Sequence, residues 1–268
     1  MVFCVRYFLL TISYDGTDFC GWQRQDHQNK KEAVRTVQCE LESALEKLHR
    51  QPVILYGSGR TDSGVHAMGQ AANFFSPIDS IPVENYPRAL NSILPKDIRI
   101  LDAQIKDEDF NSRFSATSRV YRYFIMEDKF ISANQTKYIW GVRYKPNIEK
   151  LNEMASCLRG EIDCASFAAS GDESVSTFRY LDNAHFFYQS SFPNDEKVLV
   201  FEIEANAFLW KMVRTITGTL IELDRDNKPV DSFKKILEAK NRCMAGVTAP
   251  STGLFLWNVK FDGIRRHP

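Results

Sequence analysis

Residues 52–75 read PVILYGSGRTDSGVHAMGQAANFF and form the stretch around which the rest of the chain is organised. The apolar runs at its two ends, 52–56 and 70–75, are typical of β-strands. Between them, glycines at 57, 59 and 64 permit tight turns and let a ligand approach the main chain. The stretch therefore predicts two strands of a sheet joined by a loop that is suited to a binding or catalytic site.

This loop carries two charged side chains, Arg60 and Asp62. A lone carboxylate on a glycine-rich turn suits a nucleophile or a general base. Aspartate and glycine are also the residues of ordinary turns, so a structural Asp62 beside a solvated Arg60 explains the composition as well. The loop alone leaves both interpretations open.

The elements around the loop follow a β-α-β-β-α-β order, which is that of a ferredoxin-like or RRM-like domain. Thr36 is placed to cap a helix, Pro82 opens another, and Pro87 fits only in or near the first turn of that helix. The first half is expected to contain strands over 3–14, 52–57, 68–75 and 98–105, and helices from Thr36 and from Pro82.

The second half is expected to repeat this order with longer connections. Its predicted elements are a strand over 119–126, a helix over 148–160 capped by Asn147, strands over 176–188 and 197–206, helices over 207–223 and 231–240, and a strand over 254–261. We therefore predict an α+β fold of two ferredoxin-like domains, 1–112 and 113–268. Together they form a mixed, mainly antiparallel sheet with helices on one face.

The charge balance limits the kinds of partner. With 34 basic and 34 acidic residues the formal net charge is zero, so a nucleic-acid partner would need local basic patches.

Six cysteines without a C-x-x-C pair and five histidines without ligand spacing predict reduced thiols and no metal. The apolar run near the N-terminus is too short for a membrane span and lacks the features of a signal peptide, so a cytoplasmic protein is expected.

Residues 59–67 resemble the catalytic motif of the tRNA pseudouridine synthase A family. Other stretches resemble the same family in the same order, so that the resemblance extends from about residue 7 to 261. These stretches are 14–16 with 19–23, 90–91 with 94–98, 114–116 with 119–123, 206–214, and 253–256. Two departures are Ser63, where the family often has alanine, and Trp210-Lys211, which stands in place of a frequent histidine-rich pair.

The resemblance implies an enzyme that isomerises uridine to pseudouridine at positions 38, 39 and 40 of the tRNA anticodon stem-loop. It implies no cofactor and no metal, and an active site in a central cleft. Asp62 is then expected to act as nucleophile or base, Tyr121 to stack on the uracil, and Arg214 to pair with Asp62.

The resemblance also implies substrate contacts outside these three residues. Arg60 would fill the space of an extruded nucleotide, and Leu254 would pack on the uracil. Tyr123 shares a strand face with Tyr121, so one of the two is expected merely to pack. His66 has no evident task in the reaction, which favours a structural role. The expected contacts are Arg60, Leu254, Tyr123, Arg122, Arg24 and His66.

RNA binding is expected from two basic stretches, one with aromatic residues between its charges. They are Arg113, Arg119, Arg122 and Lys129, and Arg24, Lys30, Lys31 and Arg35. The resemblance implies a homodimer that holds tRNA jointly. Two rival interpretations are a tRNA-binding protein without turnover and a metal-dependent RNA hydrolase that uses Asp62. The second lacks neighbouring carboxylates and histidines at ligand spacing.

Overall fold

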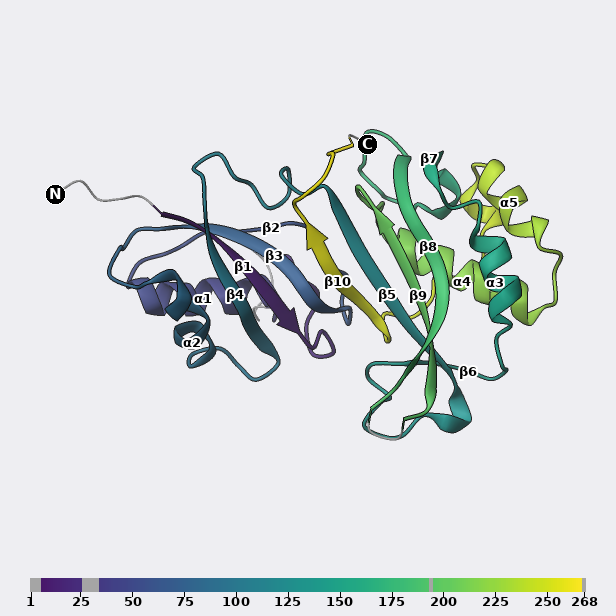
Figure 1. The fold of residues 1–268 in the computed structure, drawn as a ribbon, viewed down its shortest axis with the longest axis horizontal. Coiled ribbons are helices and arrows are strands. Elements are labelled where there is room, and N and C mark those ends of the chain that lie inside the picture. The colour runs from purple at the N-terminus through teal and green to yellow at the C-terminus, as the bar shows by residue number, and fades with distance from the viewer. Residues whose placement is uncertain (1–5, 26–33, 193–194, 267–268) are drawn as a thin grey trace. The chain divides into compact units, whose positions relative to one another are not determined.

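The computed structural model describes residues 6–25, 34–192 and 195–266 (Figure 1). These residues contain ten strands in a mixed β-sheet architecture and five α-helices, which confirms the predicted α+β class. The chain divides into two compact units. One comprises the described residues up to Ala116 together with Leu256–Gly263, and the other comprises Thr117–Phe255 and the residues from Ile264. One of the boundaries between the units therefore falls inside the last strand, Leu254–Lys260.

The first unit has the β-α-β-β-α-β order expected from its sequence. Its strands are neighbours in the order β4-β1-β3, and β2 also pairs with β3; all these pairs are antiparallel. The loop that carries Asp62 joins β2 to β3. The elements are β1 (Arg6–Tyr14), α1 (Val37–His49), β2 (Leu55–Gly57), β3 (His66–Ser76), the 3₁₀ helix η1 (Val83–Asn85), α2 (Tyr86–Asn91) and β4 (Ile98–Lys106).

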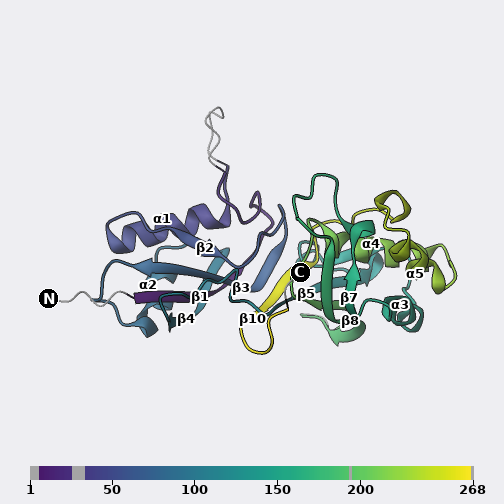
Figure 2. The ribbon, with the colours of Figure 1, turned by 90° about the horizontal axis from the view of Figure 1, so that it is seen from above.

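An aromatic core joins the helices of the first unit to its sheet. The rings of Phe8 and Phe74, on neighbouring strands, are 5.4 Å apart, and the ring of Tyr86 in α2 lies 4.6 Å from that of Phe8. All three side chains are fully buried, and each such burial stabilises the fold by roughly 1.5–3 kcal/mol. Figure 2 shows α1 along one face of these strands. The core thereby fixes the sheet whose edge carries the glycine-rich loop.

The second unit adds two short strands to the predicted pattern, β6 and β7. Strands β5, β9, β8 and β7 are antiparallel neighbours in that order, while β6 pairs with β5 in parallel. The elements are β5 (Ser118–Glu127), η2 (Asp128–Phe130), β6 (Trp140–Val142), α3 (Ile148–Ala155), β7 (Gly160–Asp163), η3 (Ala165–Phe167), β8 (Phe178–Ser190), β9 (Lys197–Ala205), α4 (Met212–Arg225), α5 (Asp231–Glu238) and η4 (Arg242–Met244). The last strand, β10 (Leu254–Lys260), belongs to this unit only in its first two residues.

The local signals at helix ends were predictive in three cases and misleading in two. Thr36 and Asn147 cap α1 and α3 by accepting main-chain N–H bonds, and Pro87 lies in the first turn of α2, as predicted. The helix predicted over 148–160 ends at Ala155, and Gly160 instead begins β7. The predicted start of a helix at 207 was wrong, because α4 begins at Met212. Lys211 has φ of 59°, and a residue in this left-handed region cannot continue a right-handed helix.

Candidate active site

The loop that carries Asp62 is anchored through the residue before it. The Thr61 side chain is buried, and its hydroxyl lies 2.8 Å from the hydroxyl of Tyr14 on β1. The Thr61 carbonyl accepts a hydrogen bond of 3.1 Å from the Trp22 main-chain N–H. Asp62 itself is half-buried, and its carbonyl accepts a bond from the Val65 N–H. The main chain around the carboxylate is therefore held at fixed points.

Residues 15–22 hold the other side of this loop. The Phe19 carbonyl accepts bonds from the Gly64 N–H (3.3 Å) and from the Ser63 hydroxyl (3.1 Å). The guanidinium of Arg35 lies over the Phe19 ring, 4.1 Å from its centroid. Arg35 also donates to both carboxylate oxygens of Asp97, at 2.8 and 3.1 Å, and this contact raises the pKa of Arg35. Arg35 thus links Asp97 to Phe19, the residue whose carbonyl bonds to the loop.

His66 lies at the end of the same loop, at the start of β3. Its side chain is 1% exposed, and its Nδ1 atom accepts a hydrogen bond of 3.1 Å from the Gly16 N–H. The Asp15 carboxylate lies 3.2 Å from the same nitrogen. These contacts give the imidazole the structural role of joining the turn after β1 to the loop.

The close packing of these two segments gives a prediction for stability. A Cβ atom added at Gly16 would lie 2.0 Å from the Val65 carbonyl oxygen, whereas one added at Gly59 meets nothing within 4 Å. Gly16→Ala is therefore expected to lower the free energy of unfolding by about 3 kcal/mol or more. Gly59→Ala, in the same loop, is expected to change it by less than about 0.5 kcal/mol. Denaturant unfolding of the two variants measures the difference, and equal values would contradict this account of the packing.

The other candidate residues of the first unit lie on its surface. Arg60 is exposed, and its Nε donates to the Gln23 side-chain carbonyl at 3.2 Å. Arg24 is half exposed and forms an ion pair of 3.0 Å with Glu42 of α1. The predicted contacts Lys30 and Lys31 lie outside the described residues.

The two tyrosines of β5 differ strongly in exposure. Tyr123 is fully buried, and its hydroxyl donates a hydrogen bond to the Pro250 carbonyl. Burial raises the pKa of this hydroxyl, and the charge of Arg214 opposes that effect. Tyr121 is half-buried, and its ring meets the Phe208 ring edge-on at 5.1 Å. Tyr123 is thus the more deeply buried of the two tyrosines.

Arg214 is held by the segment that leads into β10. Its Nε donates to the Ala249 carbonyl at 2.8 Å, and the Ala249 N–H donates to the Arg214 carbonyl at 3.1 Å. Leu254, the first residue of β10, is 3% exposed. Neighbouring carbonyls at 249 and 250 therefore position the side chains of Arg214 and Tyr123.

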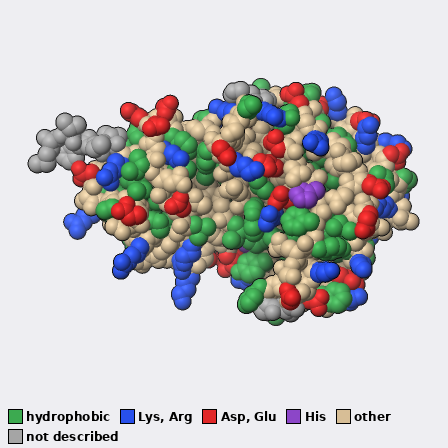
Figure 3. All heavy atoms as spheres, in the orientation of Figure 1, with side chains coloured by type: hydrophobic (Ala, Val, Ile, Leu, Met, Phe, Trp, Pro, Cys, Tyr) green, Lys and Arg blue, Asp and Glu red, His purple; other side chains and the backbone are tan. Residues whose placement is uncertain are grey.

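The basic residues predicted around β5 are engaged by neighbouring groups of the unit. Arg122 lies opposite Glu202 in the β5–β9 pair and contacts its carboxylate at 2.7 Å. Lys129 contacts the Glu127 carboxylate at 2.7 Å, and Arg119 donates to the Asn206 carbonyl at 2.7 Å. On the face of the molecule in Figure 3, acidic and basic side chains are interspersed. This distribution agrees with the zero net charge.

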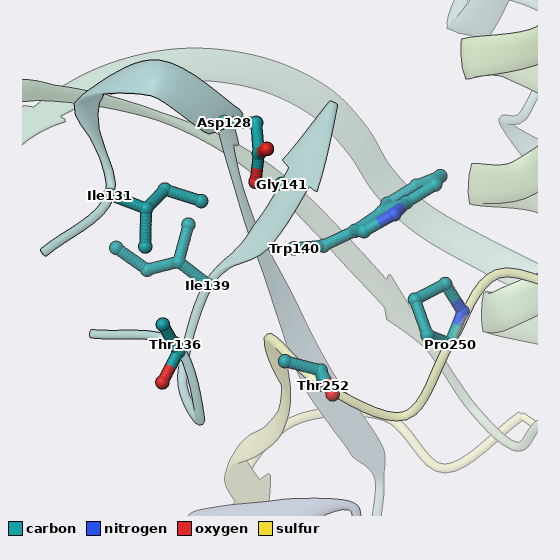
Figure 4. Close-up of a pocket in the computed structure, with 8 residues that line it drawn as sticks. All are labelled: Asp128, Ile131, Thr136, Ile139, Trp140, Gly141, Pro250 and Thr252. Carbon is teal, nitrogen blue, oxygen red and sulfur yellow. The ribbon is translucent and has the colours of Figure 1, made fainter. Parts of the chain in front are cut away.

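A hollow of about 250 Å³ lies in the second unit beside β6 (Figure 4). Figure 4 shows Trp140 and Gly141 on β6, and Pro250 and Thr252 on the segment before β10. None of the candidate catalytic residues lines this hollow. Its lining residues are Asp128, Ile131, Thr136, Ile139, Trp140, Gly141, Pro250 and Thr252.

The described residues contain no group of three or more histidine, cysteine, aspartate or glutamate side chains that could hold a metal ion. Within the same residues, no helix is both long and apolar enough to cross a membrane.

Comparison with known proteins gives a consistent result. The family model described as tRNA pseudouridine synthase matches residues 10–115 and 154–262. Proteins named tRNA pseudouridine synthase A are 54% identical in Treponema denticola (94% of this chain, 92% of the relative), 48% in Treponema pallidum strain Nichols (90% and 84%) and 41% in Bacillus subtilis (94% and 98%). The matched ranges include Asp62 and Arg214, while Tyr121 lies between them. On this coverage, the chain belongs to the tRNA pseudouridine synthase family.

Proposed function

We propose that this protein converts uridine to pseudouridine at positions 38, 39 and/or 40 of the tRNA anticodon stem-loop, with Asp62 as its catalytic residue. Family membership makes the protein an isomerase that pseudouridylates tRNA. The observation that carries the finer proposal is the loop from Gly57 to Ala67. It lies within the matched range, and it presents a half-buried carboxylate on an anchored main chain.

The reaction is an internal rearrangement. The glycosidic bond from C1′ to N1 breaks, the uracil turns, and a new bond forms from C1′ to C5. The C5 proton leaves and N1 takes up a proton, so the net composition of the RNA does not change. A carboxylate serves this chemistry in two ways, by covalent attack on the sugar or base, or by removal of a sugar proton to give a glycal-like intermediate. Asp62 is proposed for that role in either route.

The other residues are proposed to prepare the nucleotide and the carboxylate. Tyr121, whose ring is half-buried against Phe208, is proposed to stack on the uracil, and Arg214 is proposed to pair with Asp62 during the reaction. Chemistry on a base requires that the base leave the stack, and the exposed planar guanidinium of Arg60 can take its place there. Leu254 is proposed to contact the uracil face, and Arg24 and Arg122 the RNA backbone.

We also propose that the protein is a cytoplasmic homodimer. The homodimer is supported by the family resemblance, and the cytoplasmic location by the proposed tRNA substrate. Sedimentation equilibrium would show a mass of twice 30.8 kDa.

The test uses tRNA labelled with tritium at C5 of uridine. Wild-type protein is expected to release tritium without cleaving the RNA, because the C5 proton is the group lost when the new bond forms. Replacing the uridines at 38, 39 and 40 with cytidine, singly and together, assigns the release to positions. Strand cleavage, or no release from any uridine-containing tRNA, would contradict the proposal, and binding without release would favour a tRNA-binding protein.

A further inference from the structure

Trp210 and Lys211, the two residues before α4, form an aromatic and cationic pair at the surface. Trp210 is 46% exposed, and the Lys211 ammonium lies 4.4 Å from the centroid of its indole ring. Nucleic-acid bases stack on exposed aromatic rings, and a lysine is a mobile point charge that suits a phosphate. The pair therefore offers the two groups that a single nucleotide needs.

The main chain of this pair is fixed by the turn at residues 169–172. The Trp210 N–H donates to the Asp172 carboxylate, and the Trp210 carbonyl accepts a bond of 3.1 Å from the Ala169 N–H. Gly171, with φ of 88°, lies next to the indole, since a Cβ atom there would be 3.7 Å from its Cζ3 atom. Lys211 has φ of 59°, an uncommon conformation for a side chain with a Cβ atom, and such conformations gather at functional sites.

The positive charge of Arg179 partly offsets the negative charge of Asp172, the residue that anchors the Trp210 N–H. Arg179 on β8 is 5% exposed, and its positive charge acts on Asp172. The Arg179 guanidinium donates to the Ser176 and Phe178 carbonyls at 2.8 and 2.5 Å. Within the described residues its Nε has no hydrogen-bond partner. The buried Arg179 charge therefore reduces the repulsion that Asp172 would exert on a phosphate bound near Trp210 and Lys211.

Lys211 differs from two comparable lysines of the same unit. Lys129 lies over the exposed ring of Phe130 and contacts the Glu127 carboxylate at 2.7 Å, and Lys240 lies over Phe178 and contacts Asp163 at 3.2 Å. Lys211 forms no ion pair with any residue that the structure describes. Its charge is therefore open to an anion from outside the unit.

The pair is also placed between two residues of the proposed catalytic machinery. Phe208, two residues before Trp210, contacts the Tyr121 ring, and Arg214, four residues after Trp210, lies in the first turn of α4. An RNA strand that delivers a uridine to Tyr121 and Arg214 brings its neighbouring nucleotides to this segment. We propose that Trp210 and Lys211 bind a nucleotide that flanks the target uridine, the indole stacking on its base and the ammonium contacting its phosphate. This inference rests on the proposed function.

The test measures tRNA affinity and turnover separately, with the full-length protein. Trp210→Ala is expected to weaken binding of tRNA about tenfold or more, since loss of one base–aromatic stack has an effect of that order. Trp210→Phe, which keeps a ring, is expected to restore affinity to within about threefold of wild type. Lys211→Gly keeps the left-handed backbone and removes the charge, so it is expected to weaken binding and to reduce the salt dependence by about one phosphate contact.

A matched control exists in Phe130, which is 45% exposed beside Lys129 at 4.9 Å. Phe130→Ala is expected to bind tRNA as wild type does, and thermal unfolding confirms that each variant is folded. Wild-type affinity of Trp210→Ala, or an equal loss in Phe130→Ala, would overturn the inference. Tritium release by the wild type tests the proposed function independently: turnover with an unchanged Trp210→Ala affinity rejects only the stacking site, and weakened affinity without any turnover rejects only the reaction.

Discussion

Replacing Asp62 by asparagine is expected to reduce tritium release from C5-labelled tRNA by roughly 10⁴-fold or more, because the amide can act neither as a nucleophile nor as a base. Asparagine has nearly the same shape. The hydrogen bonds that anchor the loop through Thr61, Ser63 and Gly64 do not involve the replaced group. The variant should therefore bind tRNA with an affinity close to that of the wild type.

The matched control for this substitution is Asp79→Asn, at an exposed aspartate of the same unit. It removes the same charge and should keep the wild-type rate. Single-turnover kinetics with saturating protein separate chemistry from binding. If Asp62→Asn released tritium at more than about a hundredth of the wild-type rate, Asp62 would not be the catalytic residue. Its role would then be structural, within the turn.

Replacing Arg214 by lysine is expected to reduce kcat/KM by roughly 10²- to 10³-fold, which is the usual effect of losing one preorganised electrostatic group. Lysine keeps the positive charge but has no Nε–H to donate to the Ala249 carbonyl, so the charge is no longer held in place. Arg214→Ala, which loses the charge as well, should be at least as slow. Steady-state kinetics with tRNA measure both variants.

Tyr123→Phe provides the comparison for Arg214. It removes a hydrogen bond to Pro250, the carbonyl next to the one that Arg214 uses, without touching a charge. Its expected loss of kcat/KM is less than about tenfold. If Tyr123→Phe were as slow as Arg214→Lys, the effect would belong to the stability of the 249–250 segment and not to the guanidinium.

Local signals in the sequence were enough to predict much of the fold. The helix caps at Thr36 and Asn147 and the strands around the glycine-rich loop depend on residues close in sequence, so they could be recognised. Strands β6 and β7 have three and four residues, too few for a periodic pattern. The late start of α4 depends on the conformation of Lys211, which no propensity scale anticipates.

The candidate site shows the same limit. Arg35 was grouped with an RNA-binding patch, yet it pairs with Asp97, 62 positions away in sequence. Arg122 likewise meets Glu202 through strand register. Such pairs are set by tertiary packing, and the sequence shows only that the charges exist. The family motif predicts which residues matter, whereas their partners within each unit required the structure.

The carbonyls of residues 249 and 250 have a consequence for how this protein can be dissected. Arg214 and Tyr123 are oriented by main-chain oxygens, and Ala249 has no side chain left to truncate. Side-chain substitutions in this segment leave both carbonyl acceptors in place, so alanine scanning does not test what these oxygens contribute. Amide-to-ester replacement by protein semisynthesis, which weakens a chosen carbonyl acceptor, is the kind of chemistry that can reveal its contribution.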